Sequence, residues 1–126
     1  MQNLLKLTLL TAGLLAAQDT KVTPLVTKAL EGIPGKEASL LKVEYAPGAT
    51  GSVHRHNAQV FVYVLDGSIV MQVKGGKEVT LGPGQTFTET PTDIHVVGRN
   101  ASKTKPAAFL AFFVKDEGAP AVVPVP

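Results

Sequence analysis

Residues 54–67 read HRHNAQVFVYVLDG, and this stretch decides the fold. In a β-strand, side chains at positions i and i+2 point to the same face, so His54 and His56 present their imidazoles side by side. The run from Val60 to Asp66 is rich in β-branched and aromatic residues, which suit a half-buried sheet. Asp66-Gly67 then predicts a tight hairpin. One continuous segment therefore supplies a strand scaffold and two candidate metal ligands.

A third histidine, His95, follows a Gly-Pro-Gly turn, in the segment QTFTETPTDIHVVGRNAS (residues 85–102). The chain has three histidines in all. A neutral imidazole is a good ligand for zinc, copper, iron and nickel. Three histidines on two strands would form one face of a coordination shell and leave positions open for water, dioxygen or a substrate oxygen. We therefore predict that His54, His56 and His95 bind a divalent transition metal (Fe, Mn, Ni, Cu or Zn).

Two segments resemble the two sequence motifs of the cupin superfamily: PGATGSVHRHNAQVFVYVLDG (residues 47–67) and LGPGQTFTETPTDIHVVGRN (residues 81–100). In the first motif, Gly48, His54, His56 and Gly67 stand where the family pattern has them, and the usual glutamate position falls on Val60. The resemblance covers residues 42–114. It implies an all-β fold, a double-stranded β-helix or jelly-roll barrel, with a three-histidine site in a small single-domain cupin.

The second motif matches the family less completely. Gly84 and His95 are in place, but Thr90 and Thr92 replace the usual proline and glycine, and Asn100 comes one place late.

The resemblance also implies a homodimer, and exposed strand edges give a physical reason for dimerisation.

The fourth metal ligand is open, because the valine at position 60 cannot coordinate. Gln59 would turn inward as a ligand if a β-bulge shifted the strand by one residue. Glu89 is the alternative, since a carboxylate on a strand that enters the core is costly unless it is paired or bound to metal. We expect Glu89 either to bind the metal or to act beside it as a catalytic general base.

The remaining sequence reads as short strands separated by Gly, Pro and Asp, which favours a sandwich or barrel. Residues 18–38 are expected to form an N-terminal arm and loop, with a short edge strand at Val22–Val26 because Pro24 lacks a ladder donor. Residues 39–116 form the predicted barrel. Residues 117–126 alternate proline with small apolar residues and predict an extended, loosely held tail, or alternatively a segment docked along a second subunit.

Composition excludes several classes of site. The chain has 126 residues, a net charge of +2 and no cysteine, so disulfides, thiolate zinc sites and thiol nucleophiles are ruled out. Its lysines are scattered and form no basic block, so we expect no nucleic-acid partner.

Residues 1–17 predict a signal peptide. Leu4–Ala17 is apolar and ends in small residues before a polar segment, and it is too short to span a bilayer comfortably. We therefore expect a secreted or periplasmic protein with no membrane association in its mature form. An amphipathic N-terminal helix packed on the domain or on a partner is the alternative.

Three functions fit this sequence. The first is a metal-dependent enzyme acting on a small molecule, and the resemblance implies a dioxygenase-like oxidoreductase. The second is a non-catalytic, metal-containing module that binds or senses a small ligand. The third is a metal-free barrel in which the histidines are packed polar groups. We rank the three functions in this order, with the first two close together, because one fold hosts many functions.

Overall fold

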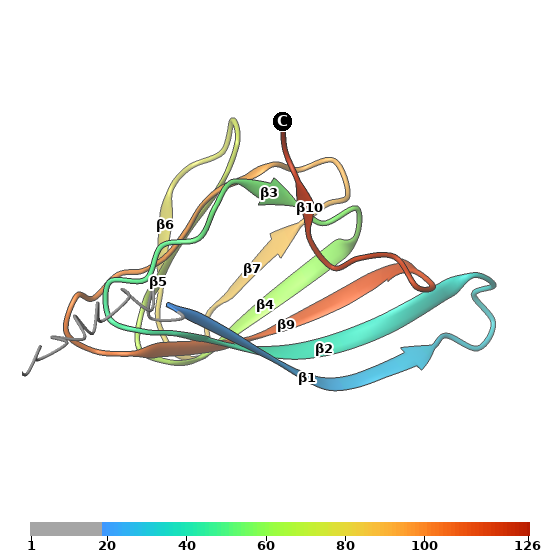
Figure 1. Cartoon of the computed structure of the whole chain (residues 1–126), viewed down its shortest axis with the longest axis horizontal. Helices are drawn as coiled ribbons and strands as arrows, with labels where there is room; N and C mark the ends of the chain where they lie inside the picture. The colour runs from blue at the N-terminus through green and yellow to red at the C-terminus, as the bar shows by residue number, and fades with distance from the viewer. Residues whose placement is uncertain (1–18) are drawn as a thin grey trace, which may run out of the picture.

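The computed structural model describes residues 19–126, in which all the regular elements are β-strands (Figure 1). They form two five-stranded antiparallel sheets, with strand orders β1-β2-β9-β4-β7 and β10-β3-β8-β5-β6. The predicted all-β jelly-roll architecture is confirmed, while the predicted signal segment lies outside the described residues. The strands are β1 (Thr20–Ala29), β2 (Lys36–Tyr45), β3 (His54–Arg55), β4 (Gln59–Asp66), β5 (Ile69–Val73), β6 (Val79–Leu81), β7 (Thr86–Glu89), β8 (His95–Asn100), β9 (Ala107–Asp116) and β10 (Val123–Pro124).

The core lies between the two sheets and follows the two-residue period of the strands. In β4, Val60, Val62 and Val64 are buried, whereas the residues between them are exposed. They face buried side chains of β5, including Ile69 and Met71, in one hydrophobic cluster. Each such side chain contributes about 1.5–3 kcal/mol on burial. The alternation therefore fixes which face of β4 looks into the barrel.

The hairpin between β4 and β5 turns at Gly67, as the Asp-Gly pair predicts. Gly67 has a φ of 70°, in the left-handed region that favours glycine. A Cβ atom there would also lie 2.5 Å from the carbonyl oxygen of Pro106 and 2.9 Å from the Cα atom of Ala107. This glycine is therefore required both for the turn and for the close approach of the β8–β9 connection.

The N-terminal arm is more regular than the sequence predicts. An edge strand containing Pro24 is confirmed, but β1 is twice the predicted length and pairs along β2 (Lys36–Tyr45). The expected boundary at residues 38 and 39 is wrong because the Gly and Pro residues near Gly32 form only a tight turn, closed by a bond from Leu30 N–H to Lys36 O. The edge proline coincides with a register shift between Pro24 and Val26.

The C-terminal segment is not loosely held, contrary to the sequence-based expectation. Val123 and Pro124 form β10, which pairs with Arg55 and His54 of β3 in the same chain. In Figure 1 the segment crosses from the end of β9 to β3. Backbone pairing that is non-local in the sequence outweighs the local polyproline preference here. This contact places the tail beside the first two histidines.

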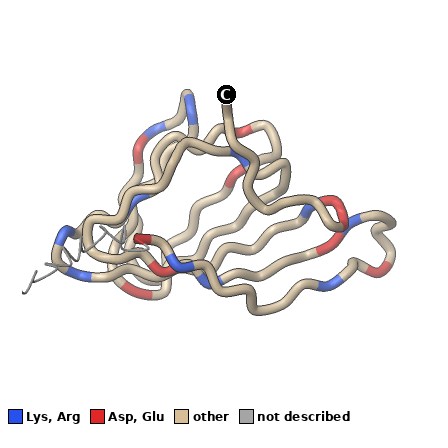
Figure 2. Tube along the Cα trace, viewed as in Figure 1, with Lys and Arg blue, Asp and Glu red and all other residues tan. Residues whose placement is uncertain are grey.

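Charged residues of both signs are dispersed along the described part of the chain (Figure 2). Cross-strand ion pairs join β2 to β9, among them Lys36–Asp116 and Lys115–Glu37, each 2.5 Å long. Among residues 19–126 there is no helix with the length and hydropathy needed to cross a membrane.

Candidate metal centre

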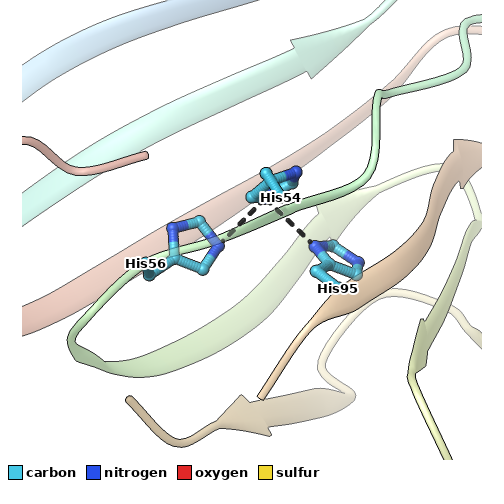
Figure 3. Close-up of side chains that lie close together, drawn as sticks. All are labelled: His54, His56 and His95. Atoms are coloured by element: carbon cyan, nitrogen blue, oxygen red, sulfur yellow. Dashed lines mark hydrogen bonds between the residues drawn. The ribbon is translucent and has the colours of Figure 1, made fainter. Parts of the chain in front are cut away.

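The three histidines converge because two strands place them directly opposite each other. His54 lies in β3 and His95 begins β8, and these two residues are partners in the β3–β8 ladder. His56 follows β3 and precedes Asn57, whose φ of 49° turns the chain toward β4. One ligand atom from each histidine lies within 4.8 Å of the others. The predicted convergence is therefore confirmed (Figure 3).

Together with Glu89, the imidazoles form a closed ring of four donor groups. His54 Nε2 lies 3.1 Å from His56 Nε2 and 3.3 Å from His95 Nδ1. The carboxylate closes the ring, with Oε2 3.4 Å from His56 Nε2 and Oε1 3.6 Å from His95 Nδ1. Ligands about 2.0–2.2 Å from one ion lie about 3.0–3.5 Å apart. The spacing of this ring fits a transition metal.

Two backbone carbonyl groups orient the first two imidazoles. His54 Nδ1 donates to the carbonyl of Ser52 over 2.8 Å, and His56 Nδ1 donates to the carbonyl of Ala121 over 2.7 Å. A neutral imidazole that donates through Nδ1 carries its lone pair on Nε2. The two Nε2 lone pairs then face each other at 3.1 Å and repel unless a cation, either a proton or a metal ion, lies between them. Such outer hydrogen bonds are typical of metal-binding histidines.

Glu89, which the sequence predicts as the alternative fourth group of the site, approaches this ring from the end of β7. It is 3% exposed and is the cross-strand partner of Val60, the residue at the family's usual glutamate position. Its carboxylate therefore reaches the site from the neighbouring strand. Within the described part of the chain, Glu89 Oε1 and His95 Nε2 are buried without a hydrogen-bond partner. A buried carboxylate of this kind costs several kcal/mol unless a cation compensates it.

Gln59 does not join the site, and its prediction as a ligand is wrong. Its side chain is exposed, while its neighbour Val60 is buried. The bulge that would turn Gln59 inward is absent, because β4 keeps its register with β9 from Gln59 through Val64. The side chain accordingly lies on the outer face of the sheet.

The ring shifts the pKa values of its members in opposite directions. Burial acts to lower the pKa of His56, but the carboxylate of Glu89 and the carbonyl of Ala121 outweigh burial and raise it. For His95 burial dominates, and its pKa falls despite the carboxylate. Nearby, burial and the charge of Glu89 raise the pKa of Tyr45 to about 12. In the metal-free ring His56 therefore holds a proton more readily than His95, and its Nε2 must be deprotonated when a metal binds.

The ring opens into a cavity of about 440 Å³ between the two sheets. Sequence reasoning missed several residues of its wall. Tyr45 lies on the inward face of β2. Its orientation depends on the register of β2 with β9, which the sequence alone does not give. Ala121 and Val122 come from the C-terminal segment. The described residues that line the cavity are mostly apolar and include no lysine or arginine.

Gly98 supports the ring of His95 from behind, and its replacement by alanine is expected to displace that ring. An added Cβ would lie 2.9 Å from His95 Cε1, 3.1 Å from His95 Nε2 and 3.3 Å from the Tyr45 hydroxyl oxygen. We expect about a tenfold loss of metal affinity in a titration with Zn²⁺, comparable to the loss of an outer-shell partner. Gly82→Ala is the matched control, since its Cβ would meet only a side-chain atom of Gln85 at 3.9 Å. Equal affinity in the two variants would contradict the expectation.

Comparison with known proteins identifies the family. The family model of the cupin domain matches residues 41–113. Among solved structures, the chain is similar to the cupin domain of an XRE family transcriptional regulator from Enterobacter cloacae, with 25% identity and a TM-score of 0.57 over 76% of this chain and 96% of that one. It is also similar to the polyketide cyclase RemF from Streptomyces resistomycificus, with 21% identity and a TM-score of 0.65 over 86% of this chain and 72% of that one.

A third similar structure is oxalate oxidase in complex with the substrate analogue glycolate. It has 23% identity and a TM-score of 0.64, and the match covers 85% of this chain but only 55% of that one. No curated protein sequence matches the chain. The family match covers more than half of the sequence and includes all three histidines, so the chain belongs to the cupin domain family.

Proposed function

We propose that this cupin binds a divalent transition metal through His54, His56 and His95, with Glu89 beside them, and acts as a dioxygenase-like oxidoreductase on a small molecule. The observation that carries the proposal is the pair of Nε2 atoms 3.1 Å apart, each oriented by a backbone carbonyl, at the end of a cavity. When bound, a redox-active ion would supply Lewis-acid and electron-transfer chemistry toward an oxygen-bearing ligand.

Glu89 has a role of its own in this proposal. Its two oxygens lie beside different imidazoles, so it holds His56 and His95 in their relative positions. It also lines the cavity, where a carboxylate oxygen is able to accept a proton from a ligand hydroxyl group. We therefore assign Glu89 to the site as a metal ligand or a general base.

The walls of the cavity favour an uncharged ligand with an apolar body. Val62, Phe109 and Phe113 supply apolar surface, while hydroxyl groups come from residues such as Tyr45 and Thr50. An anionic ligand would find Glu89 rather than a cationic side chain, so only the metal would compensate its charge. Neutral aromatic diols, with an oxygen for the metal and a ring for the wall, fit these features best.

Glu89→Gln tests the proposal. Elemental analysis of the purified protein should find about one equivalent of transition metal, and the loaded protein should consume oxygen with a neutral diol. Structural zinc sites with four ligands bind with about 10–16 kcal/mol, so one ligand in four is worth roughly 3 kcal/mol, or about 100-fold in affinity. The glutamine variant should lose about that much if Glu89 is a ligand, or lose turnover alone if it is a base.

Gln59→Ala is the matched control, because Gln59 precedes the partner of Glu89 but lies on the outer face. It should retain both metal and turnover. A glutamine variant at position 89 with unchanged metal content and unchanged oxygen uptake would remove that residue from the site. A wild-type protein that binds none of the five metals would refute the proposed function.

A non-catalytic module that binds or senses a small ligand is the second candidate. It is favoured by the similarity to a cupin domain of a transcriptional regulator, of which this chain covers 96%. The two functions separate by what is recovered from the purified protein. A tightly bound, unchanged ligand with no oxygen uptake supports binding or sensing, whereas conversion of the ligand supports the enzyme.

We also propose that the protein is a homodimer whose second copy packs on the outer face of the β4 sheet. Phe61 and Tyr63 are 49% and 48% exposed there, and Phe61 lies beside Phe112 with ring centroids 6.2 Å apart. Aromatic side chains at this exposure are unusual on a surface that stays in water and are enriched at interfaces. Light scattering after size exclusion should give a dimer mass for the wild type and a monomer mass for Phe61→Lys. A monomeric wild type would contradict this.

Export to the periplasm or outside the cell is a further proposal, supported by the apolar sequence Leu4–Ala17. Mass spectrometry of the protein recovered from its native compartment should find a new N-terminus near Gln18. An intact N-terminus on cytoplasmic protein would contradict the proposal.

A further inference from the structure

We propose that the C-terminal segment, residues 119–126, contributes to the metal centre, because the carbonyl of Ala121 positions the imidazole of His56. This inference rests on the proposed metal-binding function. It assigns a positioning role to residues far from both sequence motifs of the site. The argument depends on how the segment is anchored, how His56 is held, and what the segment adds to the cavity.

The segment is anchored on both sides of Ala121. Before it, the buried ammonium group of Lys115 donates to the carbonyl of Ala119 over 2.6 Å and to Glu37 Oε1 over 2.5 Å. The N–H of Gly118 donates to the same carboxylate oxygen over 3.2 Å. After it, β10 (Val123–Pro124) pairs with β3. Ala121 therefore spans two fixed points and presents its carbonyl group in a defined direction.

His56 needs such a partner because it lies outside the strand ladder. β3 ends at Arg55, and Asn57 turns the chain with a positive φ. The ring packs edge-on against Phe113, with centroids 5.0 Å apart, and this contact does not select a tautomer. The hydrogen bond from His56 Nδ1 to the carbonyl of Ala121 does select a tautomer, because it keeps the proton on Nδ1. The lone pair of Nε2 then points toward the other donor groups of the site.

The same segment forms part of the cavity wall. Ala121 and Val122 line the cavity, as do Thr20 and Val22 of the edge strand β1. Ala121 also packs against the hydrophobic core cluster. Loss of the segment would therefore both release His56 and open the cavity beside it.

A truncated chain that ends at Ala119 tests the inference. It removes Ala121 and β10 but keeps the oxygen atom of Ala119 that Lys115 contacts, which then belongs to the terminal carboxylate and still accepts from the ammonium group. We expect its affinity for Zn²⁺ to fall by about 10- to 100-fold, the usual cost of losing an outer-shell partner of a ligating histidine. In the metal-free protein at alkaline pH, where His56 is neutral, its imidazole nitrogen shifts should change from a fixed Nδ1–H tautomer to an averaged one. A chain that ends at Pro124 is the control and should match the wild type in both measurements.

The outcomes separate this inference from the proposed function. If the wild type binds no metal, the proposed function fails, but the tautomer of His56 still tests the role of Ala121. If the wild type binds Zn²⁺ and the chain ending at Ala119 binds it equally well with the same tautomer, the inference is overturned and the metal site stands. Should the truncated chain not fold, the full-length Val122→Gly, Val123→Gly double variant weakens β10 and is expected to change both readouts in the same direction. Wild-type values in that variant would also overturn the inference.

Discussion

Replacing His54 by alanine is expected to lower metal affinity by about 100-fold or more without unfolding the protein. Its Nε2 atom lies between the other two histidines, 3.1 Å from His56 Nε2 and 3.3 Å from His95 Nδ1. One ligand in four is worth roughly 3 kcal/mol on the scale of structural zinc sites. His54 is only partly buried, so its removal should cost the metal-free fold about 1 kcal/mol or less. A competition titration with a chelator measures the affinity.

Arg55→Ala is the matched control for this variant. Arg55 is the next residue in β3, but it is exposed and points away from the ring. Its replacement should leave affinity and stability within experimental error of the wild type. If His54→Ala bound Zn²⁺ as tightly as Arg55→Ala, the ring of donors would not be the metal site.

Gly67→Ala should produce the largest loss of stability among single substitutions at the hairpin turns. The left-handed backbone costs an alanine about 1–2 kcal/mol. The Cβ would additionally lie 2.5 Å from Pro106 O, and relieving such an overlap costs about 1–3 kcal/mol more. We expect the free energy of unfolding of the metal-free protein to fall by about 3–4 kcal/mol in urea. This corresponds to a lowering of Tm by roughly 10–20 °C for a domain of this size.

Gly75→Ala isolates the two contributions. Gly75 also has a positive φ, of 83°, but nothing lies within 4 Å of its added Cβ. It should lose only the backbone part, about 1–2 kcal/mol. Equal losses for the two variants would mean that the β8–β9 connection moves aside at little cost, and that the close contact does not constrain the fold.

Much of the fold and site was predictable because it depends on local patterns. The alternation in β4 and the pair of histidines separated by one residue both follow from the two-residue period of a strand. Glu89 was recognisable because a carboxylate in a core-facing strand requires a cation or partner. Its role at the metal stays a prediction until the variants are measured.

The features that escaped prediction depend on pairing between distant segments. The choice between Gln59 and Glu89 required the register of β4 with its neighbours, in which Val60 and Glu89 are partners. The ladder between β10 and β3 joins residues about 70 positions apart in sequence, and proline-rich composition alone indicated a loose tail. A one-residue change of register would reverse each of these assignments.

The carboxylate reaches this site from a different strand than in the family pattern. Since Val60 and Glu89 are direct cross-strand partners, a carboxylate on either would enter the same space. A search that requires glutamate at the position of Val60 would miss such a site, whereas one that follows the strand register would find it.

The pairing of β10 with β3 has a practical consequence for how the protein should be purified. Pro124 is the ladder partner of His54, so any residues fused after Pro126 begin only three positions beyond that contact. A polyhistidine purification tag fused there would bring additional imidazoles next to the proposed ligands and would compete with them for an added metal ion. Metal stoichiometry should therefore be measured on protein whose carboxyl end carries no such tag.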